Sequence, residues 1–437
     1  MNNLRLLTGL LYAVLSGCWI CCLGQNVMTL EELFAIAEAN SPQLRPSLTS
    51  LTEAEREISV AKADRLPDIN ASLSLSYIGD GFTTERDFSD YQRAPIPHFG
   101  NTLSVSVSQP VYTGGALTSA IELADMKLTA ARYASDFQRD NIRFRLAGFY
   151  LDIYKYTNLR EVVSNNIDAA CKVLDEMHAR YEQGTALRND ITRYELLVSD
   201  LRLQLIKIDN TIAILNASLV SIAGMEPGTV ITPDPAILDR SLPADGAAWW
   251  HNEAVANSPV LSMARTQVDI SRKAESLVLA EKRPHIGLQA AWSLDGPILV
   301  ELPPINRNLS YWYVGVGVSY NLSSLYKADK SMARCKAATL TAMDRLDAEE
   351  ANLSLAVTSD HIRHLEAYEE LKTQQKSVEL AERNYQTTST RYAADMALIT
   401  DMLDAANAKL DAEQRLVNAR INIIYSYYKL LFTSGTI

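Results

Sequence analysis

Two aspartates have the residue type and spacing to handle cations. Asp401 and Asp404 stand three residues apart, which on a helix puts both carboxylates on one face, one turn from each other. Acidic side chains in a first helical turn can also serve only as caps that complement the helix dipole. The segment 211 residues earlier keeps Asp190 but has Arg193 in place of Asp404. Capping would serve both segments equally, so we expect Asp404 to have a function of its own.

A second candidate for chemistry is a histidine pair. His361 and His364 are spaced i, i+3 beside Asp360, an arrangement that can hold a metal ion. Such pairs are common on solvated coiled-coil faces, and we predict no metal site here. The sequence contains no G-x-S-x-G, P-loop, H-E-x-x-H or paired C-x-x-C motif. We therefore expect neither an enzyme nor a cofactor.

Composition narrows the possible partners. The formal net charge of −11 argues against a nucleic-acid partner, which requires a basic surface. Three of the five cysteines lie in the N-terminal leader, which leaves Cys171 and Cys335. Two single cysteines make neither a disulfide framework nor a metal site. We expect both to pack as small residues in helix seams.

The N-terminus has the pattern of a secretory signal. Arg5 precedes an apolar run that is too short for a stable transmembrane helix. Residues 1–24 are then a signal peptide cleaved before Gln25. The alternative is a lipobox at residues 15–18, which would leave a lipidated Cys18. No other apolar run approaches the roughly 20 residues that a membrane-spanning helix needs.

The rest of the chain contains an internal sequence repeat. Ala-Asn-Ser-Pro-x-Leu occurs at residues 39–44 and again at 256–261. This duplication predicts a first half at 25–225 and a second at 248–437. Between them, residues 226–247 are rich in proline, so we expect a connector without regular helix.

Each half contains two amphipathic strands followed by a long helical hairpin. Leu73 and Leu75 alternate with Ser72, Ser74 and Ser76, the pattern of a strand with one apolar face. The strands are predicted at about 68–78, 102–111, 285–295 and 311–321, each near the length of a tilted strand that crosses a bilayer. Aromatic residues gather at their ends, as at membrane interfaces. The hairpins are predicted at about 116–224 and 327–432, with tip turns at Gly184 and Asp395 and helices roughly 100 Å long.

Four strands are too few to span a membrane alone. An open sheet edge is not tolerated in lipid, and a transmembrane barrel needs at least about eight strands. The strands therefore form either a small soluble sandwich or part of a barrel shared by a symmetric ring of copies.

The chain resembles the TolC family of outer membrane efflux proteins. The resemblance rests on the duplicated order, the Ala-Asn-Ser-Pro-x-Leu motifs, Arg-Tyr at 180–181 and 391–392, and residues 400–404. It implies a mainly α fold with a transmembrane β-barrel, in which a homotrimer pools four strands per copy into twelve. It also implies a Gram-negative outer membrane protein whose coiled-coil hairpins form a periplasmic tunnel.

The same resemblance implies a function and its residues. The chain would be the exit duct of a tripartite efflux or type I secretion system, docked to a periplasmic adaptor and an inner-membrane pump of the RND or ABC type. Asp401 and Asp404 would form a cation-binding gate ring. Asp190 and Tyr392 would form a latch between hairpins, although the basic residue that the family's best-known member carries nearby is Ala397 here. The alternative is a soluble or surface coiled-coil protein that forms pores or serves as a structural element.

Overall fold

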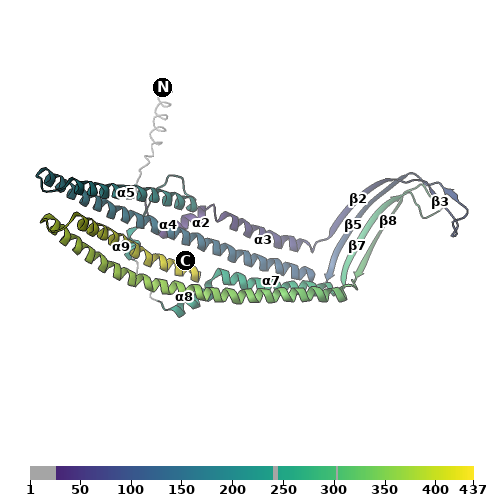
Figure 1. The fold of residues 1–437 in the computed structure, drawn as a ribbon. Helices are drawn as coiled ribbons and strands as arrows, with labels where there is room; N and C mark the ends of the chain where they lie inside the picture. The colour runs from purple at the N-terminus through teal and green to yellow at the C-terminus, as the bar shows by residue number, and fades with distance from the viewer. Residues whose placement is uncertain (1–25, 240–244, 302–303) are drawn as a thin grey trace, which may run out of the picture.

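The computed structural model describes residues 26–239, 245–301 and 304–437, and shows an elongated molecule with helices at one end and a sheet at the other (Figure 1). The predicted signal peptide and Cys18 lie outside the described residues. The tips of two long helical hairpins point away from the sheet. The sheet and the tips are thus the two ends of the molecule.

Eight α-helices and one 3-10 helix, η1 (Pro235–Asp239) in the connector, are described. The bounds of the α-helices are α2 (Leu30–Asn40), α3 (Arg45–Ala63), α4 (Ala116–Glu182), α5 (Arg188–Ala223), α6 (Ala247–Asn257), α7 (Pro259–Glu281), α8 (Ser324–Ala393) and α9 (Ile399–Ser434). With 67 residues in α4 and 70 in α8, each long helix extends for roughly 100 Å. The two hairpins, α4–α5 and α8–α9, match the predicted ranges closely.

Four strands form one antiparallel sheet in the order β2-β5-β7-β8. They are β2 (Asp68–Tyr77), β5 (Phe99–Thr113), β7 (His285–Gly296) and β8 (Leu309–Ser319). The sequence did not predict two smaller pairs, β1 (Asn26–Met28) with β6 (Ile231–Pro233) and β3 (Gly81–Thr83) with β4 (Gln92–Ala94). Strands of three residues are too short to show an alternating pattern. The first pair fastens the Pro-rich connector to the start of the described chain.

The strand register collects the apolar residues on one face of the sheet. Ala71 lies opposite Val105, which lies opposite Trp292, which lies opposite Trp312. On the other face, the hydroxyl oxygens of Ser72 and Ser104 are 2.8 Å apart. The apolar face is uncovered in the single chain, where Leu73 is 66% and Val316 67% exposed. It therefore needs an apolar environment that the chain itself does not supply.

The main core lies midway along the helices. Leu33 of α2, Leu146 and Tyr150 of α4 and Leu219 of α5 are fully buried there, and burial raises the pKa of Tyr150 to about 12. Helix α5 is apolar enough, by length and composition, to cross a membrane. The prediction that no run beyond the leader would be so apolar is therefore wrong. The structure uses α5 as the returning helix of the first hairpin.

Each hairpin ends in a left-handed glycine packed against a backbone oxygen. Gly224, with φ 70°, follows α5, and a Cβ there would collide with the carbonyl oxygen of Asn40. Gly435, with φ 73°, follows α9, and a Cβ there would lie 2.7 Å from the carbonyl oxygen of Asn257. Both asparagines come from the repeated Ala-Asn-Ser-Pro motif. The same joint thus connects each hairpin to the short helices of its half.

His364 is buried, so the expectation of a solvated histidine pair is wrong for this residue. It is 5% exposed, and its Nδ1 lies 2.8 Å from the hydroxyl oxygen of Ser426 on α9. That hydroxyl donates to the carbonyl oxygen of Ile423, so its oxygen accepts from the imidazole N–H. Burial, and then the charge of His361, lower the pKa of His364. The described residues contain no group of three metal-ligating side chains, and Cys335 is also buried.

The glycine joint predicts a difference between two substitutions. Gly224 and Gly228 both have positive φ, but only Gly224 faces backbone atoms, whereas nothing lies near a Cβ at Gly228. We expect Gly228→Ala to lower the free energy of unfolding by about 1 kcal/mol, from backbone strain alone. Gly224→Ala should cost about 2–3 kcal/mol because Asn40 must also move. Denaturant unfolding in detergent measures both, and equal losses would contradict a close joint.

The buried histidine predicts a pH dependence of stability. Since the folded pKa of His364 is lowered, the unfolded chain takes up the proton first as the pH falls through about 6.5. We expect the unfolding midpoint of the wild type to fall over this range, and His364→Gln to flatten the dependence. His361→Gln, one turn earlier and less buried, is the control and should keep most of the dependence, because burial is the larger cause of the lowered pKa. If both variants titrate alike, His364 does not carry the effect.

Candidate functional site at the hairpin tips

The two hairpins turn with the same backbone geometry at positions 211 residues apart. Gly184 has φ 76° and Asp395 has φ 59°, both left-handed. In the first turn the N–H of Thr185 donates to the carbonyl oxygen of Arg180, and in the second the N–H of Met396 donates to that of Arg391. A glycine adopts this conformation freely, whereas an aspartate is strained by it. Asp395 therefore needs a compensating contact.

Arg180 supplies that contact from the first hairpin. Its guanidinium donates to the carboxylate of Asp395, and to the backbone oxygen of Tyr392 at 3.4 Å. It also lies 5.7 Å from the centre of the Tyr392 ring. Its repeat counterpart, Arg391, reaches the backbone oxygen of Met396 in its own turn. Arg180 thus ties one tip to the other through hydrogen bonds, and the repeat comparison marked its position without indicating these bonds.

Tyr392 and Asp190 are neighbours, but they are not bonded to each other. Tyr392 is half-buried, and its pKa is raised first by burial and then by the charge of Asp190. Among the described residues, no hydrogen bond joins the two side chains. The structure therefore places the sequence-predicted latch pair close together, but it is Arg180 that contacts Tyr392 directly.

Asp401 and Asp404 are both exposed at the start of α9. Asp401 accepts a hydrogen bond from the backbone N–H of Leu398 at 3.1 Å and so caps the helix. In the described part of the chain, Asp190 makes no matching bond to Leu187, and Asp404 has no bonded partner. The sequence argument assumed that capping would be equal in the two hairpins. The structure shows that it is not. Asp404 is left with no capping function.

A buried seam holds these aspartates in place. Ile399, Met402 and Ala405, which alternate with them along α9, are 7%, 1% and 3% exposed. Met402 packs with Met177 and Ile191 of the first hairpin. This seam turns the carboxylates to the opposite side of the helix, so two negative charges lie one turn apart on a solvated face. Such a surface can attract and bind cations.

Comparison with known proteins identifies the family. The family model described as outer membrane efflux protein matches residues 33–225 and 250–436. The chain belongs to this family. As a member of the outer membrane efflux family, whose members are channel proteins, the protein is located in the outer membrane with a large periplasmic part, and its role is transport.

Relatives and solved structures agree along almost the whole chain. The pyoverdine export outer membrane protein OpmQ of Pseudomonas aeruginosa is 22% identical, over 92% of this chain and 84% of its own. The outer membrane protein TolC of Vibrio cholerae is 19% identical, over 93% and 91%. Among solved structures, the outer-membrane channel OprN superposes with a TM-score of 0.76 at 15% identity, over 93% and 90% of the two chains. VceC of Vibrio cholerae gives 0.73 at 17%, over 93% and 96%.

The contact of Arg180 predicts a local loss of order at the second tip. Because Asp395 is largely exposed, we expect the contact to contribute about 1 kcal/mol or less. Arg180→Ala should therefore speed amide exchange in residues 393–397 about two- to fivefold. Mass spectrometry of peptides from both tips measures this.

The matched control is Arg391→Ala, which removes a contact within one turn but none between hairpins. It should leave exchange in residues 181–186 unchanged. If Arg180→Ala also leaves the second tip unchanged, the two hairpins are not joined by this arginine.

Proposed function

We propose that three copies of this efflux protein close a twelve-stranded barrel in the outer membrane, and that their hairpins form a tunnel through the periplasm. The observation that carries the proposal is the sheet itself. Its apolar face is uncovered, and its outer strands, β2 and β8, each have only one partner strand among the described residues. Pairing β2 of one copy with β8 of the next satisfies both edges and gives the apolar face to lipid.

We infer that the chain consists of two duplicated halves, 25–225 and 248–437, joined by the connector 226–247. The matching glycine joints at Gly224 and Gly435 and the matching turns at Gly184 and Asp395 support this division. Each half then supplies two strands and one hairpin to the trimer.

The channel acts as an exit duct. We infer that its hairpin tips meet a periplasmic adaptor and that an inner-membrane pump, of the RND or ABC type, delivers the substrate. The name of the Pseudomonas relative states that it exports pyoverdine, and export is the role that we assign here. Membership of the outer membrane efflux family favours this function over a soluble or surface coiled-coil protein.

Asp401 and Asp404 form the gate in this proposal. In a trimer they would give two rings of three carboxylates at the end opposite the sheet. Crowded carboxylates repel one another and bind cations, so the tunnel should conduct cations selectively and be blocked by polyvalent cations from the tip side. Asp190, Tyr392 and Arg180 would hold the tips together in the closed state.

Planar bilayer recording of the purified protein tests this function. The wild type should form cation-selective channels, and the double variant Asp401→Ala with Asp404→Ala should lose selectivity and block. Glu195→Ala, an exposed acidic residue on α5, is the control and should retain both. A double variant with wild-type selectivity would show that the two aspartates are caps only. If the wild-type protein does not conduct at all, the proposed channel function is wrong.

A further inference from the structure

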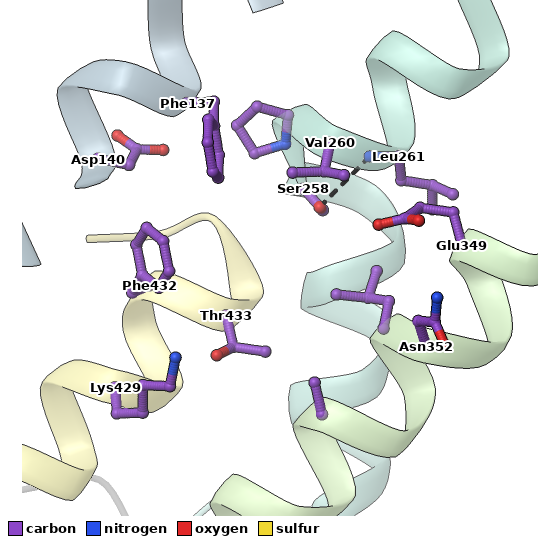
Figure 2. A pocket seen from close by; sticks show the side chains of 13 residues that line it. Phe137, Asp140, Ser258, Val260, Leu261, Glu349, Asn352, Lys429, Phe432 and Thr433 are labelled. Atoms are coloured by element: carbon purple, nitrogen blue, oxygen red, sulfur yellow. Dashed lines mark hydrogen bonds between the residues drawn. The ribbon is translucent and has the colours of Figure 1, made fainter. Parts of the chain in front are cut away.

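A cavity of about 240 Å³ lies where α9 ends against the start of α7 (Figure 2). Helix α4 lines it with Phe137 and Asp140, α8 with Glu349, and α9 with Lys429 and Phe432. The cavity thus joins elements of the first and second halves. It is somewhat smaller than the pockets that hold drug-sized ligands, which are roughly 300–1,000 Å³.

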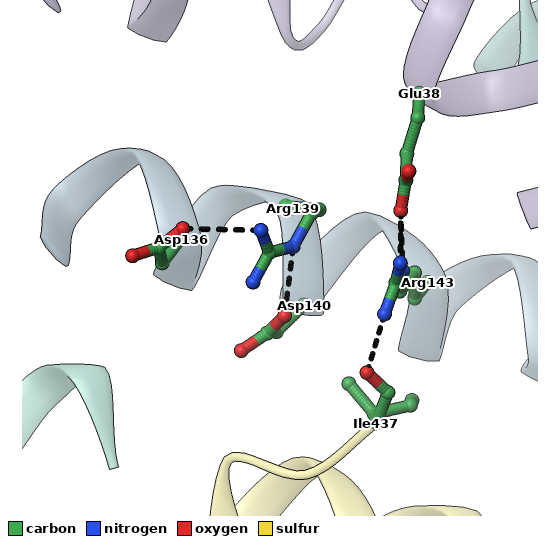
Figure 3. A network of polar contacts seen from close by, with 6 residues as sticks. All are labelled: Glu38, Asp136, Arg139, Asp140, Arg143 and Ile437. Atoms are coloured by element: carbon green, nitrogen blue, oxygen red, sulfur yellow. Dashed lines mark hydrogen bonds and ion pairs between the residues drawn. The ribbon is translucent and has the colours of Figure 1, made fainter. Parts of the chain in front are cut away.

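Asp140 is a buried carboxylate with little compensation. It is 3% exposed, and among the described residues its one bonded partner is Arg139, whose Nε lies 3.4 Å from Oδ1. Arg139 is shared with Asp136 at 3.1 Å, and Arg143 is engaged by Glu38 and by the backbone oxygen of Ile437 (Figure 3). No hydrogen bond or ion pair in the described residues reaches the other carboxylate oxygen. Burial raises the pKa of Asp140 although the charges of Arg139 and Arg143 act in the opposite direction, so a further cation beside this carboxylate would be favourable.

The walls beside Asp140 are aromatic. The rings of Phe137 and Phe432 have their centres 6.1 Å apart and are tilted by 40°. The ammonium of Lys429 lies 5.1 Å from the ring centres of Phe144 and of Phe432, so it is directed to aromatic rings, and no ion pair joins it to Asp140 among the described residues. The cavity lining therefore carries two carboxylates and one ammonium, a net charge of −1.

We propose that this cavity is a binding site for a small monovalent organic cation with an aromatic or aliphatic body, such as an arylalkylammonium. The ammonium group pairs with Asp140, and the body lies against Phe137, Phe432 and Leu261. Cation–π attraction and charge pairing act together in this site. Binding requires neither the gate nor an open tunnel, so its test is independent of the conductance test.

The experiment uses the full-length protein in detergent at neutral pH and 1-naphthylmethylammonium as the probe. Isothermal titration should show saturable binding, and the probe should raise the unfolding midpoint. The neutral alcohol 1-naphthalenemethanol should bind at least about tenfold more weakly, because it cannot pair with the carboxylate. Asp140→Asn should weaken binding of the ammonium about tenfold and leave binding of the alcohol unchanged.

Asp136→Asn is the matched control. It removes a carboxylate from the same helix and the same arginine, but Asp136 does not line the cavity, so the affinity should fall much less than in Asp140→Asn. Phe137→Leu, which keeps the charge and removes a ring, should weaken binding about threefold to tenfold. It serves as the second test should Asp140→Asn fail to fold.

Three results would each overturn the proposal. The first is no saturable binding to the wild type. The second is equal affinity for the ammonium and the alcohol. The third is an equal effect of the Asp136 and Asp140 substitutions or, where Asp140→Asn does not fold, wild-type affinity in Phe137→Leu.

Discussion

Backbone N–H and C=O groups at the edge of a sheet need hydrogen-bond partners, and hydrocarbon offers none. In this protein β2 and β8 are such edges, on a sheet whose apolar face is exposed. A single chain cannot satisfy both conditions, since its four strands are too few to close on themselves. The proposed trimer follows from this constraint, and the shared barrel in turn requires the hairpins of the three copies to run side by side away from the membrane.

The two hairpins share one design but differ in charge. Each turn has a residue in the left-handed conformation at the same position and the same backbone hydrogen bond. The second hairpin, however, has Asp395 in place of Gly184 and Asp404 in place of Arg193. Arg180 of the first hairpin donates a hydrogen bond to the strained Asp395. The charges that differ between the repeats therefore differ in their contacts. Asp395 pairs the two tips within one chain, whereas Asp404 forms no hydrogen bond or ion pair among the described residues.

Regular elements were predictable because their signals are periodic. The alternating serines of β2 and the three- and four-residue spacing along α4 and α8 each extend over many residues, so the strand and hairpin boundaries agree with the structure to within a few residues. The capping box at the start of α2, in which the side chains of Thr29 and Glu32 each accept a backbone N–H, is likewise a contact between residues close in the sequence. These features depend on neighbours in the sequence.

Contacts between distant segments were not predictable in this way. Arg180 and Asp395 are 215 residues apart, and His364 meets Ser426 only because α8 and α9 pack in one register. A histidine on an amphipathic helix gives no indication of which face is covered. Asp140 is similar, since its burial depends on where α7 and α9 meet.

The glycine joints also bear on how such proteins can change length. Each returning helix, α5 or α9, ends at Gly224 or Gly435 against an asparagine of the neighbouring corner, so only α4 and α8 continue from the hairpins to the sheet. Seven residues added to every helix of both hairpins would preserve the heptad seam and move the tips outward by about 10 Å. The membrane-embedded end would be untouched. Envelopes of different width can therefore be bridged by inserting whole heptads, the same number in both helices of each hairpin, without changing the barrel.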